Sequence, residues 1–194
     1  QPASLDLRLG QRAWRIQASF LPGHTQTVMD KIEKFSMYEL DLSEGAVLET
    51  GCVYIVELME SLALPQDICA SANPKSSTGR LDVFTRLITD GAVEFDSVSA
   101  GYNGPLYAEI SPRTFSVMVR KGSRLSQLRL RRGQQILDDA GHADLQARHQ
   151  LVRFDDETIV SIQDGIGLSV NLMPQPQKTQ MLLRLKGHLH SPPP

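Results

Sequence analysis

The sequence predicts a mostly β fold, a distorted barrel or sandwich of short strands with one or two short helices. Apolar and polar residues alternate over many short segments, as they do along strands that bury one face. Glycine, proline and asparagine separate these segments, which is typical of the turns in an antiparallel β domain. The sequence lacks the regular alternation of strands and helices that a doubly wound fold requires.

The first strands are predicted from strict alternation. Ser4–Leu9 alternates without interruption, and Gly10 is expected to end this strand. Trp14–Ala18 alternates again and predicts a second strand. Residues 22–45 leave two interpretations open, because Met29–Met37 is compatible with one or two helical turns or with a long loop.

The later elements follow from apolar runs and turn residues. Ser76 or Ser77 is expected to cap a short helix that runs to about Phe84. Residues 111–114, Ser-Pro-Arg-Thr, predict a hairpin turn, and residues 140–150 have the composition of a helix. Further strands are expected at residues 52–58, 67–72, 92–95, 105–111, 115–120, 125–131 and 165–173.

Composition limits the classes of function. The chain has 194 residues and a formal net charge of −2, so no overall positive charge favours nucleic-acid binding. No apolar run approaches the roughly 18 residues that a membrane-spanning helix needs. The chain opens without a secretory signal pattern, and we therefore expect a cytoplasmic protein.

Several catalytic motifs are absent from the sequence. Zinc-dependent nucleobase deaminases need His-x-Glu and Pro-Cys-x-x-Cys, and neither occurs. The two cysteines, Cys52 and Cys69, are too few for a four-cysteine zinc site and are expected to be reduced thiols. The sequence therefore predicts no protein metal site and no zinc.

Two polar segments have the chemistry of an anion site. Residues 74–80, Pro-Lys-Ser-Ser-Thr-Gly-Arg, combine a cation, hydroxyl groups and the start of a helix, where backbone N–H groups are free. Gly122 leads into a predicted strand that carries Gln127 among apolar neighbours. Taken alone, the first segment is more typical of a capped surface helix, and the second of a half-exposed strand.

A third segment contains a candidate general base. Gly101–Gly104 predicts a tight turn into a strand whose alternation places Tyr107 and Glu109 on one face. Leu106, Ala108 and Ile110 lie on the opposite face. A glutamate on a strand is most often a solvated charge, but in a pocket burial and neighbouring groups could tune it for proton transfer.

Taken together, these segments resemble the dCTP deaminase family, which has a dUTPase-like fold. Gln1–Gly10 is similar to the first motif of the family, and Lys75–Arg80 is similar to its Arg-Ser-Ser-x-x-Arg motif. Gly101–Glu109 resembles its Gly-aromatic-x-Gly turn with the catalytic glutamate five residues after the second glycine. Gly122–Leu128 resembles its Gly-x-x-x-x-Gln-Leu strand, and the four motifs occur in the family order within residues 1–128.

The resemblance implies deamination of dCTP to dUTP and ammonia without zinc. Glu109 would activate a water for attack on C4 of cytosine, and Ser76 and Arg80 would hold that water and the developing tetrahedral centre. The implied substrate-binding residues are Lys75, Ser77 and Gln127 at the phosphates, Ser99, Tyr102 and Gly104 in the turn at the sugar, and the backbone near Tyr107 at the base edge.

The resemblance also implies partners and an assembly. The expected ligands are dCTP and dUTP, with dTTP as a candidate inhibitor. Mg²⁺ would arrive with the triphosphate rather than in a cage of protein ligands. Family members form homotrimers with active sites shared between neighbouring subunits, and a tandem-module protein could provide an equivalent assembly. Nucleic-acid and membrane partners are not expected.

The sequence departs from the family pattern at several positions. Lys75 replaces an arginine, which keeps the charge but removes bidentate phosphate contact. Ser99 replaces an aspartate, which puts sugar recognition in doubt. Lys178 and Gln180 lie where the family has a segment that closes the phosphate site, but they do not match it convincingly.

The sequence also predicts a division of the chain. Residues 1–134 would form the dUTPase-like nucleotide-binding core, and residues 135–190 a C-terminal helix with strands that complete the domain. Residues 191–194, Ser-Pro-Pro-Pro, would be a tail or linker. Because some family members contain two such modules in tandem, this chain could be the first module of a double-length protein.

Two other functions remain open at this point. A dUTP diphosphatase on the same fold would need an aspartate where Ser99 stands. The absence of this aspartate, together with the presence of Glu109, favours the deaminase. A non-catalytic module that binds nucleotide or supports assembly is the other alternative. The departure at Ser99 and the unmatched C-terminal segment favour that second interpretation.

Overall fold

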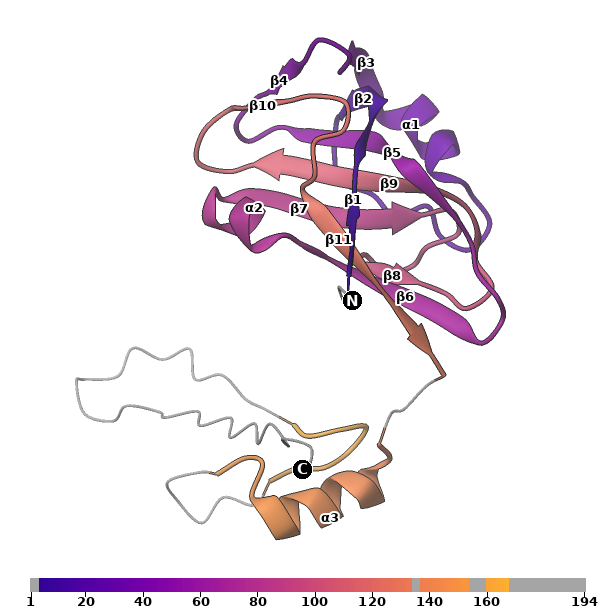
Figure 1. Cartoon of the computed structure of the whole chain (residues 1–194), viewed down its shortest axis with the longest axis vertical. Helices are drawn as coiled ribbons and strands as arrows, with labels where there is room; N and C mark the ends of the chain where they lie inside the picture. Colours follow the sequence, from indigo (N-terminus) through magenta and orange to yellow (C-terminus); the bar gives the residue numbers. More distant parts are fainter. Residues whose placement is uncertain (1–3, 134–136, 154–159, 168–194) are drawn as a thin grey trace, which may run out of the picture. The chain divides into compact units, whose positions relative to one another are not determined.

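The computed structural model describes residues 4–133, 137–153 and 160–167 (Figure 1). Residues 1–134 form one compact unit and residues 135–194 form another. The elements of the first unit are β1 (Leu5–Leu7), β2 (Leu9–Ile16), α1 (Val28–Phe35), β3 (Ser36–Asp41), β4 (Ala46–Leu48), β5 (Val53–Ala63), β6 (Ile68–Pro74), α2 (Ser76–Arg80), β7 (Val83–Thr89), β8 (Ser97–Val98), β9 (Asn103–Pro112), β10 (Val117–Val119) and β11 (Ser126–Arg132).

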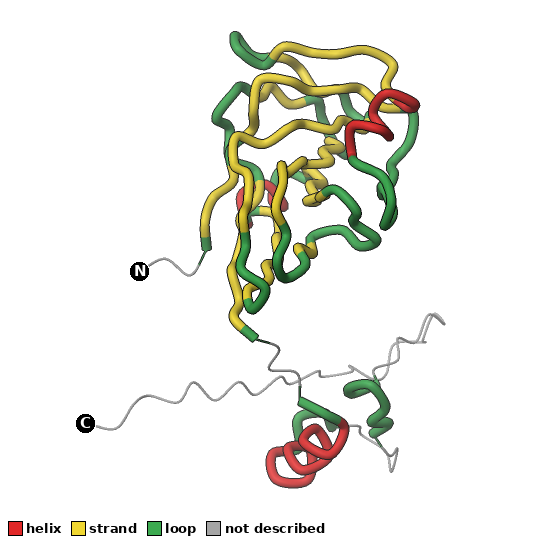
Figure 2. Tube along the Cα trace, turned by 90° about the vertical axis from the view of Figure 1, so that its right-hand side faces the viewer, coloured by secondary structure: helices red, strands yellow, loops and turns green. Residues whose placement is uncertain are grey.

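The first unit consists mainly of two antiparallel sheets, which Figure 2 shows from the side. The larger sheet has the strand order β3-β2-β5-β9-β7, and the smaller has the order β1-β11-β6-β8. Strands β4 and β10 form a separate antiparallel pair. The predicted mostly β fold is confirmed.

The two sheets pack against each other through the main hydrophobic core. Leu106, Ala108 and Ile110 of β9 are buried in this core, as their alternation predicts. Leu7 and Leu128 reach the same core from the smaller sheet. The alternation that buries these side chains fixes which face of β9 carries Tyr107 and Glu109.

A second, smaller core lies on the opposite face of the larger sheet. Tyr107 is buried there with Ile55 of β5 and Ile88 of β7. Helix α1 covers this cluster with Val28 and Ile32. The helix therefore shields the face of the sheet to which Tyr107 belongs.

The segment left open by the sequence contains both a helix and a strand. Residues 28–35 form α1, and the chain continues directly into the edge strand β3. Thr27 caps the helix, because its hydroxyl accepts a hydrogen bond from the Asp30 backbone at 3.1 Å. The Asp30 carboxylate accepts in return from the Thr27 backbone N–H at 2.8 Å, which completes a capping box.

Removing this cap is expected to weaken the fold measurably. Thr27→Ala should lower the free energy of unfolding by about 1 kcal/mol, since a helix N–H loses its acceptor. Urea unfolding followed by circular dichroism measures the change. Thr25→Ala, at an exposed threonine close by, is the matched control and should have no comparable effect. Equal stability of the two variants would contradict the role given to the cap.

The helix expected from Ser76 or Ser77 to Phe84 is much shorter in the structure. Helix α2 ends at Arg80, and Asp82 has a φ of +54°, which no α-helix continues through. The residues that follow belong to β7, where Val83 and Leu87 are buried in the main core. The expected end of the helix is therefore the beginning of a strand.

The strand expected at residues 92–95 is also wrong. These residues lie in the turn between β7 and the short strand β8. Asp96 has a φ of +60°, and its carboxylate accepts a hydrogen bond from the Leu87 backbone N–H at 2.7 Å. This local hydrogen bond stabilises a turn where the apolar composition suggested a strand.

Gly10 does not end the first strand as expected. Strand β2 begins at Leu9 and continues through Gly10, and the pairing of β2 with β5 is irregular between Leu9 and Ala13. A Cβ atom at Gly10 would lie 2.6 Å from the backbone oxygen of Glu57. The glycine therefore permits a close approach of two backbones and not a turn.

The expected hairpin at residues 111–114 does not form. Strand β9 already pairs with β5 on one side and β7 on the other, so neither of its edges is free for β10. Strand β10 pairs with β4 instead. The turn therefore leads from the larger sheet into the separate two-stranded pair.

In the second unit, the helix expected at residues 140–150 is confirmed as α3 (Asp139–His149). The Asp138 side chain caps it by accepting from the Gly141 backbone N–H at 2.8 Å. Of the strand expected at 165–173, residues 168–173 lie outside the described residues, as do Lys178, Gln180 and the expected tail at 191–194. Where the chain is described, no helix has the length and apolar character to cross a membrane.

Candidate functional site

The first group of predicted site residues lies on and beside α2. Lys75 precedes the helix, and its ammonium forms an ion pair with Asp6 of β1. Ser76, Ser77 and Arg80 are exposed. Their side chains form no hydrogen bond or ion pair with another described residue, so they are available to a ligand or to a second chain.

The structure holds α2 beside the start of β11. The buried Thr78 donates a hydrogen bond from its hydroxyl to the Leu125 backbone oxygen at 2.9 Å. The Lys75 backbone N–H donates to the same oxygen at 2.9 Å. The short helix is therefore fixed at its first turn, although its hydroxyl and guanidinium groups remain exposed.

Gln127 lies close to this helix on the smaller sheet. Strand β11 places Gln127 directly opposite Asp6 of β1 and Asn73 of β6. The Ser4 hydroxyl lies 3.0 Å from Oε1 of Gln127 and donates to it. Asp6 thus lies opposite Gln127 in the strand register and also forms an ion pair with Lys75. The predicted phosphate-binding residues Lys75 and Gln127 therefore belong to one polar cluster.

The second group forms the turn before β9. The Tyr102 hydroxyl donates to the Pro105 backbone oxygen at 2.5 Å and accepts from the Asp90 backbone N–H at 3.3 Å. Burial raises the pKa of Tyr102 to about 12, so the hydroxyl stays a donor at neutral pH. A Cβ atom at Gly104 would lie 2.8 Å from this hydroxyl, which explains the glycine at that position.

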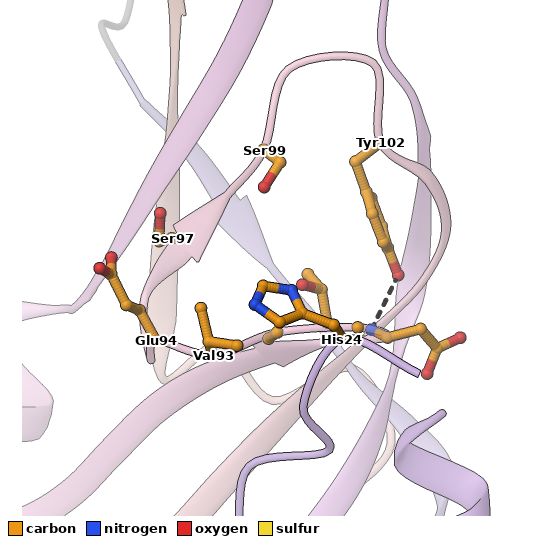
Figure 3. A pocket seen from close by; sticks show the side chains of 10 residues that line it. His24, Val93, Glu94, Ser97, Ser99 and Tyr102 are labelled. Carbon is orange, nitrogen blue, oxygen red and sulfur yellow. Dashed lines mark hydrogen bonds between the residues drawn. The ribbon is translucent and has the colours of Figure 1, made fainter. Parts of the chain in front are cut away.

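Ser99 and Tyr102 line a pocket of about 250 Å³, which Figure 3 shows from close by. His24 and Asp90 contribute to the same pocket, and both were missed in the sequence. Asp90 also accepts a hydrogen bond from the Val28 backbone N–H at 2.7 Å, at the start of α1. The pocket is lined by His24, Thr89, Asp90, Gly91, Ala92, Val93, Glu94, Ser97, Ser99 and Tyr102.

The third group lies on β9, on the face away from the main core. Glu109 is only 2% exposed and lies opposite Arg86 of β7 in the strand register. Both Nε and Nη2 of Arg86 donate to Oε1 of Glu109, at 3.2 Å and 2.5 Å. Oε2 of Glu109 is buried and accepts no hydrogen bond from any described residue.

Tyr107 is the neighbour of Glu109 on this face of β9. It lies in the middle of the larger sheet, opposite Glu57 of β5 and Ile88 of β7. Burial, and to a lesser extent the negative charge of Asp90, raises the pKa of Tyr107 to about 12. Its phenol therefore stays neutral within the second core.

The structure thus brings the predicted residues together in three groups rather than in one cavity. Ser99, Tyr102 and Gly104 share the turn at the pocket, and Lys75 shares a polar cluster with Gln127. No hydrogen bond or ion pair within the described ranges joins Glu109 to Ser76 or Arg80. Arg86 was missed because no strand was predicted between the helix expected to end near Phe84 and residue 92, and alternation along β7 is the signal that could have found it.

Asp96 adds a second carboxylate close to the Arg86–Glu109 pair. Burial raises the pKa of Asp96, against the opposing effects of the Leu87 hydrogen bond and the charge of Arg86. Because the folded-state pKa is raised, the folded protein binds this proton more tightly than the unfolded chain. Asp96 therefore favours folding at low pH, and this contribution is lost as the pH rises through the folded pKa.

The charge on Asp96 is therefore expected to cost stability at neutral pH. Asp96→Asn keeps an oxygen for the Leu87 N–H and a residue type that tolerates positive φ. It should be more stable than the wild type at pH 7, with the difference shrinking as the pH falls toward the ordinary carboxyl range. Urea unfolding across this pH range measures the difference in the free energy of unfolding between the variant and the wild type. A difference that grows toward low pH would contradict the raised pKa of Asp96.

The described residues contain no group of three or more histidine, cysteine, aspartate or glutamate side chains that could hold a metal ion.

Comparison with known proteins identifies relatives of the first unit. Residues 1–134 match the family model of the 2'-deoxycytidine 5'-triphosphate deaminase (DCD) N-terminal domain. A dCTP deaminase of Halorubrum lacusprofundi is 33% identical over 131 residues, which cover 66% of this chain and 61% of the relative. A dUMP-forming dCTP deaminase of Beutenbergia cavernae is 30% identical over 129 residues, which cover 66% of this chain and 64% of the relative.

A solved structure shows a closer likeness. The crystal structure of 2'-deoxycytidine 5'-triphosphate deaminase from Agrobacterium tumefaciens is 64% identical, with a TM-score of 0.69. The likeness covers 78% of this chain but 46% of that chain. The chain thus spans less than two thirds of the length of these curated relatives and less than half of that solved protein.

Proposed function

Because this chain belongs to the family of 2'-deoxycytidine 5'-triphosphate deaminase N-terminal domains, we propose that it binds dCTP and removes the amino group of its cytosine by hydrolysis of the C4–N4 bond. The products are dUTP and ammonia. The single observation that supports this function best is Glu109, a buried carboxylate with one oxygen held by Arg86 and the other without a partner among the described residues. A carboxylate in this state has a free position for a proton from water.

The proposed reaction uses Glu109 as a proton shuttle and needs no zinc. Glu109 takes a proton from water while the water oxygen bonds to C4 of cytosine, which gives a tetrahedral centre. Glu109 passes this proton to N3 of the ring, and the second proton of the water then moves to the departing amino group as the C4–N4 bond breaks and C4=O forms. Ser76 and Arg80 hold the water and stabilise the developing charge, which is an electrostatic contribution to the rate.

The proposed site is completed by a second copy of the chain. Ser76 and Arg80 are exposed and make no hydrogen bond or ion pair with Glu109 in the described part of one chain. In a homotrimer, α2 of one copy reaches Glu109 of the next, and the two sets of residues form one site. A protein with two such modules in tandem provides the same arrangement within a chain.

Substrate recognition is assigned to the remaining groups. Lys75, Ser77 and Gln127 bind the phosphates, with Mg²⁺ carried by the triphosphate. Ser99 and Tyr102 contact the sugar in the pocket that they line, and Gly104 allows the turn to close around the Tyr102 hydroxyl. The backbone near Tyr107 reads the base edge, and dTTP would compete for the same site as an inhibitor.

Product analysis tests this function directly. The purified chain is incubated with dCTP and Mg²⁺, and the nucleotides are separated by ion exchange while ammonia is measured enzymatically. Equal amounts of dUTP and ammonia are the expected result. Release of dUMP together with ammonia would indicate a second hydrolytic step on the same fold.

A non-catalytic binding or assembly module is the second candidate function. The observation that favours it is the ion pair of Lys75 with Asp6, because a phosphate would have to compete with this carboxylate for the ammonium. Binding of dCTP without release of ammonia, alone and within the full-length gene product, would support the module and reject the deaminase.

A further inference from the structure

The ion pair between Arg86 and the buried Glu109 joins strand β9 to its neighbour, the edge strand β7. The two residues are direct partners in the strand register, and the Arg86 side chain is 25% exposed. Two donors of Arg86 converge on the same oxygen, Oε1 of Glu109. A buried carboxylate requires such a partner, because desolvation would otherwise strongly disfavour its charge.

The guanidinium of Arg86 is itself fixed on several sides. Its Cζ lies 3.5 Å from the ring centroid of Phe95 and 4.8 Å from that of Phe84. Nη2 also donates to the Ser19 hydroxyl at 3.0 Å. Stacking on aromatic rings and a planar set of donors hold an arginine in one orientation, which a lysine would not reproduce.

The second oxygen of Glu109 is left without a partner by this arrangement. Oε2 is buried and accepts no hydrogen bond from the described residues, and the same is true of the Ser111 hydroxyl. Strand alternation places Ser111 on the same face of β9 as Glu109, two residues further along. Buried polar atoms are nearly always hydrogen-bonded, so two neighbouring exceptions on one face indicate a position for a polar ligand.

We propose that Arg86 is the positioning residue of the catalytic glutamate. It holds Glu109 through Oε1, so that Oε2 is the atom that takes the proton from the attacking water, and the Ser111 hydroxyl orients that water. This inference rests on the proposed deaminase function. It adds two residues, Arg86 and Ser111, that the four sequence motifs do not contain.

Kinetics of Arg86 variants test the inference. Arg86→Ala is expected to lower kcat for dCTP by about 100-fold, because misplacing a reacting group by about 1 Å has effects of this size. KM should stay within about threefold, since Arg86 is not assigned to substrate binding. Added guanidinium, well below denaturing concentrations, should restore kcat by filling the space left by the side chain.

The matched control is Arg12→Ala. Arg12 also pairs with a glutamate, Glu39 at 3.1 Å, and its Cζ lies 4.7 Å from the Trp14 ring centroid, but it has no contact with Glu109. This variant should keep the wild-type kcat and show no response to guanidinium. A purely structural role of arginine on this sheet would affect both variants alike and would not give rescue.

The outcomes separate the inference from the proposed function. If the wild type does not release ammonia from dCTP, the proposed function fails. If the wild type is active and Arg86→Ala keeps its kcat, or loses it without guanidinium rescue while remaining folded, the positioning role is overturned. Should Arg86→Ala not fold, Arg86→Lys decides: a tenfold or greater loss of kcat with unchanged KM supports the role, and wild-type kcat overturns it.

Ser111→Ala tests the second residue separately. Loss of the hydroxyl is expected to lower kcat by about tenfold, since the attacking water loses one of its orienting groups while the general base remains. KM should again be unchanged. A wild-type kcat in this variant would remove Ser111 from the site.

Discussion

Replacing Glu109 by glutamine is expected to lower kcat for dCTP by about 10³-fold, the size of a typical general-base contribution. Glutamine keeps the shape of the side chain and an oxygen for the Arg86 donors, but it cannot accept the proton from water. The affinity for dCTP should stay within a few-fold of the wild type. Ammonia release measures the first quantity, and titration calorimetry with dCTP measures the second.

The control for this substitution is Glu44→Gln. Glu44 is exposed and its side chain forms no hydrogen bond or ion pair with the described residues, so the same loss of charge should leave kcat unchanged. A Glu109→Gln variant that still turns over dCTP at the wild-type rate would contradict the assignment of the general base. Loss of dCTP binding in that variant would instead place Glu109 in substrate recognition.

Replacing Leu106 by alanine is expected to have the largest effect on stability, about 3 kcal/mol in the free energy of unfolding. Leu106 is fully buried in the main core, on the face of β9 opposite to Glu109. The truncation removes buried methyl groups and leaves a cavity between two sheets that can collapse only partly. Urea unfolding followed by circular dichroism measures the change.

Leu130→Ala provides the comparison within the same fold. Leu130 lies on β11 but is 57% exposed, so its truncation should change the free energy of unfolding by less than about 0.5 kcal/mol. Similar losses in the two variants would mean that β9 does not bury the face described here. The face that carries Glu109 would then also be assigned wrongly.

Strand β9 and the side chains on its two faces could be predicted from the sequence. Glycines at 101 and 104 mark the turn, and the residues that follow alternate strictly. Alternation is a local property with a period of two, so it requires no knowledge of the partner strands. The prediction that Tyr107 and Glu109 share a face is confirmed.

Arg86 could not be found in the same way. The segment before it begins with a Ser-rich helix start, and the positive φ of Asp82, which separates α2 from β7, is not visible in the sequence. Its pairing with Glu109 joins residues 23 positions apart across two strands. Such a contact depends on the register of β7 and β9, which only the folded sheet determines.

The pocket beside Tyr102 could not be predicted from the sequence either. His24 precedes α1, and Asp90 follows β7, so the two are brought together only by the fold. The failed hairpin at residues 111–114 has a similar cause, because the partners that occupy both edges of β9 are distant in the chain. The turn residues at 111–114 give no information on whether an edge of β9 is free to pair with the strand that follows.

The most direct test of the deaminase assignment is the reaction in H₂¹⁸O with dCTP and Mg²⁺, followed by mass spectrometry of the nucleotide product. If a water activated by Glu109 attacks C4, one ¹⁸O atom appears on the base of dUTP and none on its phosphates. Label found only in released phosphate or diphosphate, with the cytosine intact, would show hydrolysis of the triphosphate chain and contradict the proposed deamination.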